Sequence, residues 1–194
     1  MILKKGEFMK ESMRKGSVLA LSGLVLGLCV SIACQDKAAM TELEKFKAQT
    51  AVEAQNIETV RTLFAELSKG NAGIIEDLFA SDSKYYSPSN SPTPLTRDQE
   101  IAQAKMTLTA FPDMTYEIKD IFAANDRVVV TLISSATHKG EFMGILATGK
   151  KASIGVTLVY RFRDGKVVEE IEDADFLGLF MQLGMELKPK EPAK

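Results

Sequence analysis

The chain contains no tryptophan, a single histidine and only two cysteines among its 194 residues. One imidazole, at His138, excludes a metal or catalytic site built from several histidines. The sequence also lacks a P-loop, a G-x-S-x-G motif and an H-E-x-x-H motif, which are typical of nucleotide-binding proteins, serine hydrolases and zinc proteases. These absences exclude the corresponding classes of site.

Clustered positive charge is also scarce. The formal net charge is −2, and the first 33 residues hold five of the 24 basic but only two of the 26 acidic residues. The rest of the chain is therefore more acidic than the whole. Nucleic-acid binding needs clustered basic residues, so we expect no nucleic-acid partner.

An apolar run behind a basic leader is the clearest positive feature. Residues 17–33 follow five Lys and Arg residues and end in a small residue, Ala33. This pattern is typical of an export signal, and its core of about 16 residues is shorter than the roughly 20 residues of a membrane-spanning helix. Other interpretations are an ordinary secretory signal with an incidental cysteine, or a single anchor helix.

The end of this run, Ser31-Ile-Ala-Cys34, resembles the lipobox of bacterial lipoproteins. The resemblance implies that Cys34 becomes the lipidated first residue and anchors the protein in the bacterial cell envelope. Residue 35 is Gln rather than Asp, which resembles the signal for transfer to an outer membrane where the cell has one. Cys29 leaves with the signal and Cys34 carries lipid, so we expect no internal disulfide.

The chain divides by composition into four parts. We predict a signal peptide at 1–33, the lipidated Cys34 with a tether over 34–55, one domain over 56–186, and a disordered tail over 187–194. Ile57, Val60, Phe64 and Leu67 recur at helical spacing, and Lys69-Gly-Asn71 ends that helix. We predict a second, short helix over 74–80, a strand opening into a loop over 81–96, and a third helix that Thr96 caps and that ends at Ala110.

Beyond residue 113 the apolar period changes to two. This predicts strands at about 114–123, 127–138, 151–163 and 166–174, with tight turns at Asn125-Asp126 and Asp164-Gly165. A last helix is expected over Phe176–Leu183. Helices come first and antiparallel strands follow, so the predicted fold class is α+β.

Several blocks of the domain resemble the SnoaL-like polyketide cyclase, or ester cyclase, family. The most specific is Thr137-His-Lys-Gly-Glu-Phe-Met-Gly-Ile-Leu-Ala-Thr-Gly-Lys150, and others are Phe111-Pro-Asp-Met114 and Asp175-Phe-Leu-Gly-Leu179. The resemblance covers about 56–184. It implies the cone-shaped fold of the nuclear-transport-factor-like superfamily, in which a bent antiparallel sheet wraps round about three helices and encloses an apolar cavity. It further implies a homodimer formed through the outer sheet face, and cyclase chemistry by a carboxylate without a cofactor.

Two candidates for acid–base catalysis follow. His138 shares a strand face with Leu132 and Ser134, which form a plausible cavity wall, although it can equally hold the following turn. The acidic strand 169–175 offers Asp175 or Glu172, only one of which can face the cavity by alternation. Asp175 shares one face of the strand with Val167 and Ile171, and these two residues make that face the more apolar one. This favours Asp175 as the carboxylate in the cavity. The alternative role of Asp175 is to cap the last helix.

The sequence departs from the family pattern in two places. Tyr85-Tyr86-Ser-Pro88 stands where the family typically has His-His-Asp-Pro, and Ile171 and Ala174 stand where it usually has tryptophan. The two tyrosines can still hydrogen-bond a ligand, and the smaller side chains make a polyaromatic substrate less expected. The predicted ligand-binding residues are Tyr85, Tyr86, Leu132, Ser134 and Ile171.

Three functions remain open. The protein is a membrane-anchored binder of a small hydrophobic ligand, a cyclase- or isomerase-type enzyme acting on a small carbonyl compound, or a dimeric envelope interaction module. The departures from the family and the predicted envelope location favour the binder.

Overall fold

A computed structural model describes residues 37, 39–186 and 188. The predicted signal peptide, the predicted lipidation of Cys34 and all but residue 188 of the predicted tail lie outside the described residues. In the part that is described, no helix is both long and apolar enough to cross a membrane.

The described residues from 39 to 67 are helical, so the helix that carries Ile57, Val60 and Phe64 also includes most of the predicted tether. Residues up to Gln49 form a unit of their own, and in it every described side chain is exposed. Residues 50–67 belong to the domain and bury Val60, Leu63 and Phe64. Gly70, with φ +81°, takes the left-handed conformation that ends a helix, as the sequence predicts.

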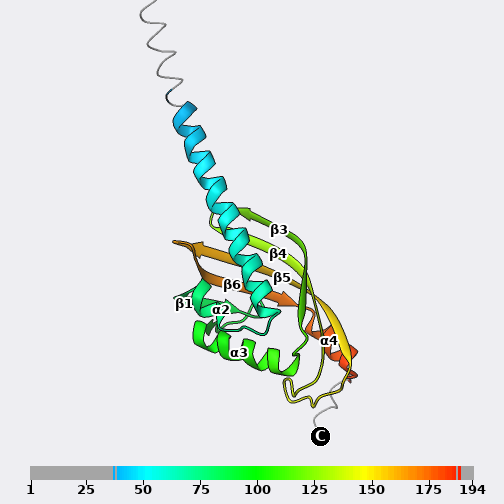
Figure 1. The fold of residues 1–194 in the computed structure, drawn as a ribbon. Helices are drawn as coiled ribbons and strands as arrows, with labels where there is room; N and C mark the ends of the chain where they lie inside the picture. The colour runs from blue at the N-terminus through cyan, green and yellow to red at the C-terminus, as the bar shows by residue number, and fades with distance from the viewer. Residues whose placement is uncertain (1–36, 38, 187, 189–194) are drawn as a thin grey trace, which may run out of the picture. The chain divides into compact units, whose positions relative to one another are not determined.

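Antiparallel strands dominate the rest of the domain, which confirms the α+β prediction (Figure 1). Their predicted bounds agree with the structure to within one residue for the four long strands. The elements are α2 (Ile74–Leu78), β1 (Phe79–Tyr86), β2 (Leu95–Thr96), α3 (Arg97–Ala110), β3 (Thr115–Ala124), β4 (Arg127–Thr137), β5 (Lys151–Arg163), β6 (Lys166–Ala174) and α4 (Phe176–Leu183).

The six strands form one sheet in the order β2-β1-β6-β5-β4-β3. All neighbours are antiparallel except β1 and β6, which are parallel. The prediction that the second helix reaches residue 80 is wrong, because Phe79 already pairs with Val167 of β6. The long strands bend strongly (Figure 1).

One extra residue in β6 changes which side chains face inward. Phe162 of β5 pairs with Val167, but its neighbour Arg161 pairs with Glu169, so Val168 has no partner on β5. This is a β-bulge, which shifts the alternation of inward and outward side chains by one residue. Val167 is buried on one side of the bulge, and on the other side Glu170 is buried instead of Glu169.

Helix α3 begins with the predicted cap. The Thr96 hydroxyl accepts a hydrogen bond from the Gln99 amide at 3.4 Å, and the Gln99 side chain accepts one from the Thr96 amide at 2.9 Å. This capping box satisfies two amides that have no partner within the helix. The helix direction that it fixes places Glu100 and Gln103 towards the sheet.

Candidate functional site

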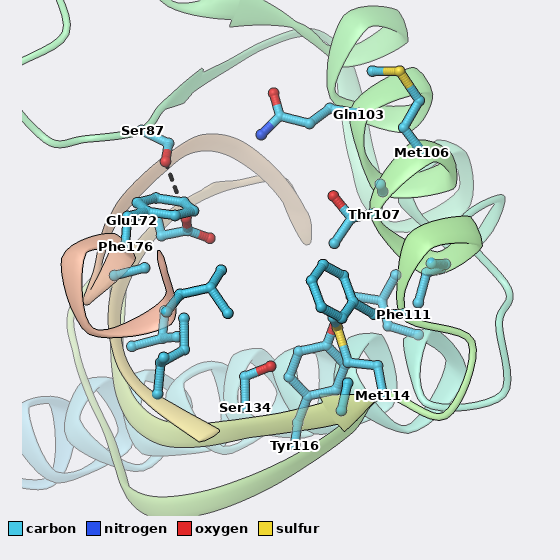
Figure 2. Close-up of a pocket in the computed structure, with 18 of the residues that line it drawn as sticks. Ser87, Gln103, Met106, Thr107, Phe111, Met114, Tyr116, Ser134, Glu172 and Phe176 are labelled. Atoms are coloured by element: carbon cyan, nitrogen blue, oxygen red, sulfur yellow. Dashed lines mark hydrogen bonds between the residues drawn. The ribbon is translucent and has the colours of Figure 1, made fainter. Parts of the chain in front are cut away.

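A cavity of about 1050 Å³ lies between α3, α4 and the concave face of the sheet. Alternation along β4 and β5 supplies its apolar wall, because every second side chain of each strand points inward. Phe111, Met114, Tyr116 and Phe176 add aromatic and sulfur-containing surface (Figure 2). The inward residues of the two strands are Leu132, Ser134, Ala136, Ala152, Ile154, Val156, Leu158 and Tyr160.

Three carboxyl groups inside the cavity interrupt this apolar lining, and a fourth, that of Glu141, is exposed at its edge. Glu170 and Glu172 come from β6, where they lie opposite Tyr160 and Leu158 of β5. Glu100 comes from the first turn of α3. The bulge at Val168 is the reason that Glu170 and Glu172 share the cavity face with these β5 residues, because pairing without it would present Glu169 and Ile171.

Glu100 and Glu170 hydrogen-bond to each other, and both are almost fully buried. Two carboxyl groups can form such a bond only when one of them is protonated. Burial raises the pKa of Glu170 well above its usual value, and the negative charges of Glu100 and Glu172 raise it further. Burial also raises the pKa of Glu100 to about 7. The proton of this hydrogen bond therefore resides on Glu170, whose carboxyl O–H donates to the Glu100 carboxylate.

Glu172 is half-buried and points into the open part of the cavity (Figure 2). Its Oε1 accepts a hydrogen bond from the Ser87 hydroxyl at 3.0 Å, and Tyr85 forms a second side-chain hydrogen bond with it. Burial raises the pKa of Glu172, and these two bonds partly offset that rise. The result is a carboxyl group that can exchange a proton closer to neutral pH than an exposed glutamate.

Three tyrosines complete the polar side of the site. Burial raises the pKa values of Tyr85, Tyr116 and Tyr160, with the nearby glutamates raising them further, so each phenol stays neutral and can donate a hydrogen bond. Tyr160 donates to Glu170 Oε1 at 3.4 Å. Tyr85 and Tyr160 therefore place donors next to the carboxyls of Glu172 and Glu170, whereas the Tyr116 hydroxyl donates to Met114 Sδ at 2.8 Å.

Four of the predicted site residues line the cavity, namely Glu172, Tyr85, Leu132 and Ser134. Tyr86 and Ile171 do not, because they alternate with inward-facing neighbours. The expectation that the set containing Val167, Ile171 and Asp175 faces the cavity is wrong, because it assumed an unbroken strand and the bulge at Val168 reverses the alternation.

Asp175 lies outside the residues that line the cavity. It is exposed, and its Oδ1 accepts a hydrogen bond from the Gly178 amide at 2.7 Å, which caps α4. This geometry matches the capping role that the sequence left open, and it places the carboxylate away from Glu172 on the cavity wall.

His138 is fully buried and does not line the cavity either. Its ring stacks on Phe111 at 5.0 Å, and Nδ1 accepts a hydrogen bond from the Thr148 amide at 3.3 Å. The His138 main chain also pairs with Gly149 and Lys150. These contacts hold the β4–β5 connection, which was the structural alternative for this residue.

Sequence reasoning missed Glu100 and Glu170. Glu100 lies in the first turn of a helix, where an acidic residue interacts favourably with the helix dipole. That role explained its presence, so its position gave no reason to expect it to be buried. The available signal was its spacing: Gln103, Ala104 and Thr107 follow at helical intervals and share its face. Within the described residues, no group of three or more His, Cys, Asp or Glu side chains is placed to hold a metal ion.

Comparisons with known proteins agree with this architecture. Residues 58–183 match the family model described as SnoaL-like polyketide cyclase. AclR from Streptomyces galilaeus, described as a candidate hydroxylase, is 30% identical in sequence, with a TM-score of 0.63 over 68% of this chain and 97% of its own. No curated protein matches the chain.

Two further solved structures are similar. IdmH from Streptomyces antibioticus, described as a candidate polyketide cyclase, is 28% identical, with a TM-score of 0.61 over 68% of this chain and 99% of its own. A SnoaL-like protein from Jannaschia is 22% identical, with a TM-score of 0.64 over 70% of this chain and 96% of its own, and supports the fold alone. The predicted nuclear-transport-factor-like fold is therefore confirmed.

Proposed function

Because the chain belongs to the SnoaL-like polyketide cyclase family, we propose that its cavity binds a small, mostly apolar organic ligand whose polar end meets Glu172. The observation that carries this proposal is the group of carboxyls on one wall of an otherwise apolar cavity. A volume of about 1050 Å³ lies at the upper end of the range for small-molecule sites. The apolar surface supplies affinity, and the polar wall fixes the orientation.

The charges around the cavity restrict the ligand further. Glu100, Glu170 and Glu172 face inward, whereas Lys105 is the one cationic residue among the described residues that line the cavity and is exposed at its edge. An anionic ligand would lie near buried carboxylates without a buried cation to pair with. The cavity therefore favours a neutral compound that carries a carbonyl or hydroxyl group.

Acid–base catalysis on such a compound is the second candidate, and the raised pKa of Glu172 favours it. Glu172 takes a proton from the carbon beside a carbonyl group, and the electron pair moves onto the carbonyl oxygen. The proton then returns to another atom of the substrate, so the carboxylate is restored. This is the proton balance of a cyclase or isomerase that uses no cofactor.

The proposal includes the location and the assembly of the protein. Lipidation of Cys34 anchors it in the bacterial envelope, and two copies pair through the outer sheet face. A Cys34→Ser variant tests the anchor: we expect it in the soluble fraction, without the mass of the acyl chains. A homodimer that binds no ligand at all would instead favour the interaction module.

Native mass spectrometry of the full chain tests ligand binding. We expect a retained small molecule in the wild type and none in Ser134→Phe, because the new ring fills the cavity from the β4 wall (Figure 2). Ser135→Phe is the matched control, since the adjacent residue points to the opposite face of β4. A Glu172→Gln variant that binds the ligand but no longer converts it would identify an enzyme.

A further inference from the structure

The mouth of the cavity is formed by residues that both line the cavity and are exposed. On α3 these are Lys105, Met106 and Thr109, on the β4–β5 connection they are Glu141 and Met143, and after β1 it is Pro88. Met106 is 65% exposed and Met143 is 71% exposed. Large apolar side chains therefore stand in water at the point where an apolar ligand has to enter.

A two-residue hairpin presents Met143. Phe142 and Ile145 exchange backbone hydrogen bonds of 3.0 and 2.9 Å, so Met143 and Gly144 form the tip, both with positive φ. Beyond the tip, Leu146 is 74% exposed. Left-handed backbone is uncommon for methionine, so the turn holds an apolar side chain outward at some conformational cost.

The base of this hairpin is fixed to the domain. The amides of Lys139 and Gly140 donate to the Ala110 carbonyl at 2.8 and 3.0 Å. A Cβ on Gly140 would lie 3.0 Å from the Ala110 Cα and the Thr109 carbonyl oxygen, so glycine allows this close approach without a shift of the α3 backbone. Phe142 also packs edge-on against Phe111, with the ring centroids 5.1 Å apart. A rigid base thus presents an exposed apolar tip.

The exposed apolar side chains are concentrated on this part of the domain. Among described residues from 68 onward, all the large exposed hydrophobic side chains except Phe122 lie on α3, on the β4–β5 connection, on α4 or two residues after α4. Helix α4 contributes Phe180 to the cavity lining. The members of the set are Met106, Met143, Leu146, Leu177, Met181 and Met185.

Basic residues flank the apolar tip. Lys139 precedes it, Lys150 and Lys151 follow it, and Lys105 of α3 lies at the edge of the same cavity, all exposed. Two acidic residues lie close to these lysines. Glu141 is near Lys139 in sequence, and Asp113 Oδ2 lies 3.7 Å from Lys139 Nζ. An apolar tip between lysines is complementary to an anionic bilayer, in which acyl chains take the apolar groups and phospholipid headgroups take the charges.

We propose that the hairpin tip docks the cavity mouth onto an anionic phospholipid surface, so that an apolar ligand passes between the bilayer and the cavity without crossing water. The docking proposal takes its ligand from the proposed function, and it takes the location at a membrane from the proposed lipidation of Cys34. From Cys34 to Thr50 the chain can extend over at most roughly 55 Å, which keeps the domain near the bilayer.

A single introduced tryptophan tests the docking, because the chain has none of its own. The full chain carrying Met143→Trp is reconstituted in phosphatidylglycerol vesicles that contain doxyl-labelled lipid. We expect the indole to be quenched roughly threefold more than the indole of Phe122→Trp, which is exposed on β3 and does not line the cavity. If Met143→Trp fails to fold, Leu146→Trp replaces it as the fluorescent reporter, and we expect the same quenching.

The charges are tested on the same reporter. In neutral phosphatidylcholine vesicles, or with Lys150→Gln and Lys151→Gln, we expect the quenching to fall towards that of Phe122→Trp. Equal quenching of the two indoles in the anionic vesicles, or no response to lipid charge, overturns the proposal. So does a dimer that Met143→Asp converts to a monomer, since a second copy would then cover the tip. Ligand retention is measured separately, so the two proposals can fail independently.

Discussion

The Ser87 hydroxyl donates a hydrogen bond to the Glu172 carboxylate at 3.0 Å, joining the segment after β1 to the cavity wall formed by β6. This contact is the one drawn in Figure 2, and it stabilises the charged form of a glutamate whose pKa burial raises. Together with the Tyr85 hydrogen bond it lowers the pH at which Glu172 changes its charge.

Ser87→Ala should raise the pKa of Glu172 further, because a bond to the charged form is lost while the burial remains. A carboxyl titration by carbon NMR measures this directly. Any activity that needs the carboxylate should shift its acid limb to higher pH. Ser89→Ala is the control, since Ser89 uses its backbone amide to contact Asp173 and keeps it after the change. An unchanged Glu172 titration in Ser87→Ala would contradict the assignment.

Stability should fall as the pH rises from about 4.5 to about 7. The pKa of Glu100 is raised from 4.5 to about 7 in the folded chain, so the folded state binds more protons than the unfolded state within this window. The penalty is absent below the unfolded pKa and complete above the folded pKa, and it reaches at most about 3 kcal/mol.

Glu100→Gln should reduce this slope and raise the melting temperature at pH 8, and Glu170 and Glu172, whose pKa values are also raised, should supply the slope that remains. The amide cannot ionise, yet it can still hydrogen-bond to Glu170. Glu76→Gln, at an exposed position on α2, is the control and should keep the wild-type slope. Thermal melts between pH 4.5 and 8 give the comparison, and parallel slopes for wild type and Glu100→Gln would be evidence against a buried ionisable Glu100.

Asp175 should behave as a cap. Asp175→Ala loses the bond to the Gly178 amide and should cost about 1 kcal/mol of stability, whereas Asp175→Asn retains an acceptor and should cost much less. Ligand retention and any turnover should survive in both variants. Chemical denaturation and native mass spectrometry measure the two effects. Loss of turnover in a stable Asp175→Asn would show that Asp175 takes part in the chemistry after all.

Removing the His138 ring should loosen the hairpin that follows it. His138→Ala leaves a void beside Phe111 and takes the acceptor from the Thr148 amide, so we expect a loss of about 2–4 kcal/mol. Hydrogen exchange should quicken between residues 139 and 149 more than in β5. Lys139→Ala, an exposed change in the same connection, should leave the exchange pattern nearly unaltered.

Local patterns were enough to predict most of the elements. The Thr96 cap and the turns at Asn125 and Asp164, both with positive φ, depend on neighbouring residues and were readable in advance. The start of the first helix could not be predicted in this way, because Ala, Glu and Lys residues are typical of a polar tether as well as of a helix.

The cavity wall depended on information that no local pattern carries. An extra residue in β6 is visible only when the strand is paired with β5, and it decides between Glu172 and Ile171. Glu100 lies 70 residues before Glu170, and the sequence around neither residue indicates that the two form a hydrogen bond. Side chains that meet across the domain are fixed by tertiary packing rather than by propensity.

Val168 is the one residue of this segment that β6 could lose without changing its inward face. Deletion of its codon would make Glu169 the neighbour of Val167, and Arg161–Glu169, Tyr160–Glu170 and Leu158–Glu172 could pair as they do now. Glu170 and Glu172 would therefore still face the cavity, on a strand without a bulge. A relative of this chain that is one residue shorter at this point could keep the same carboxyl groups in the same places.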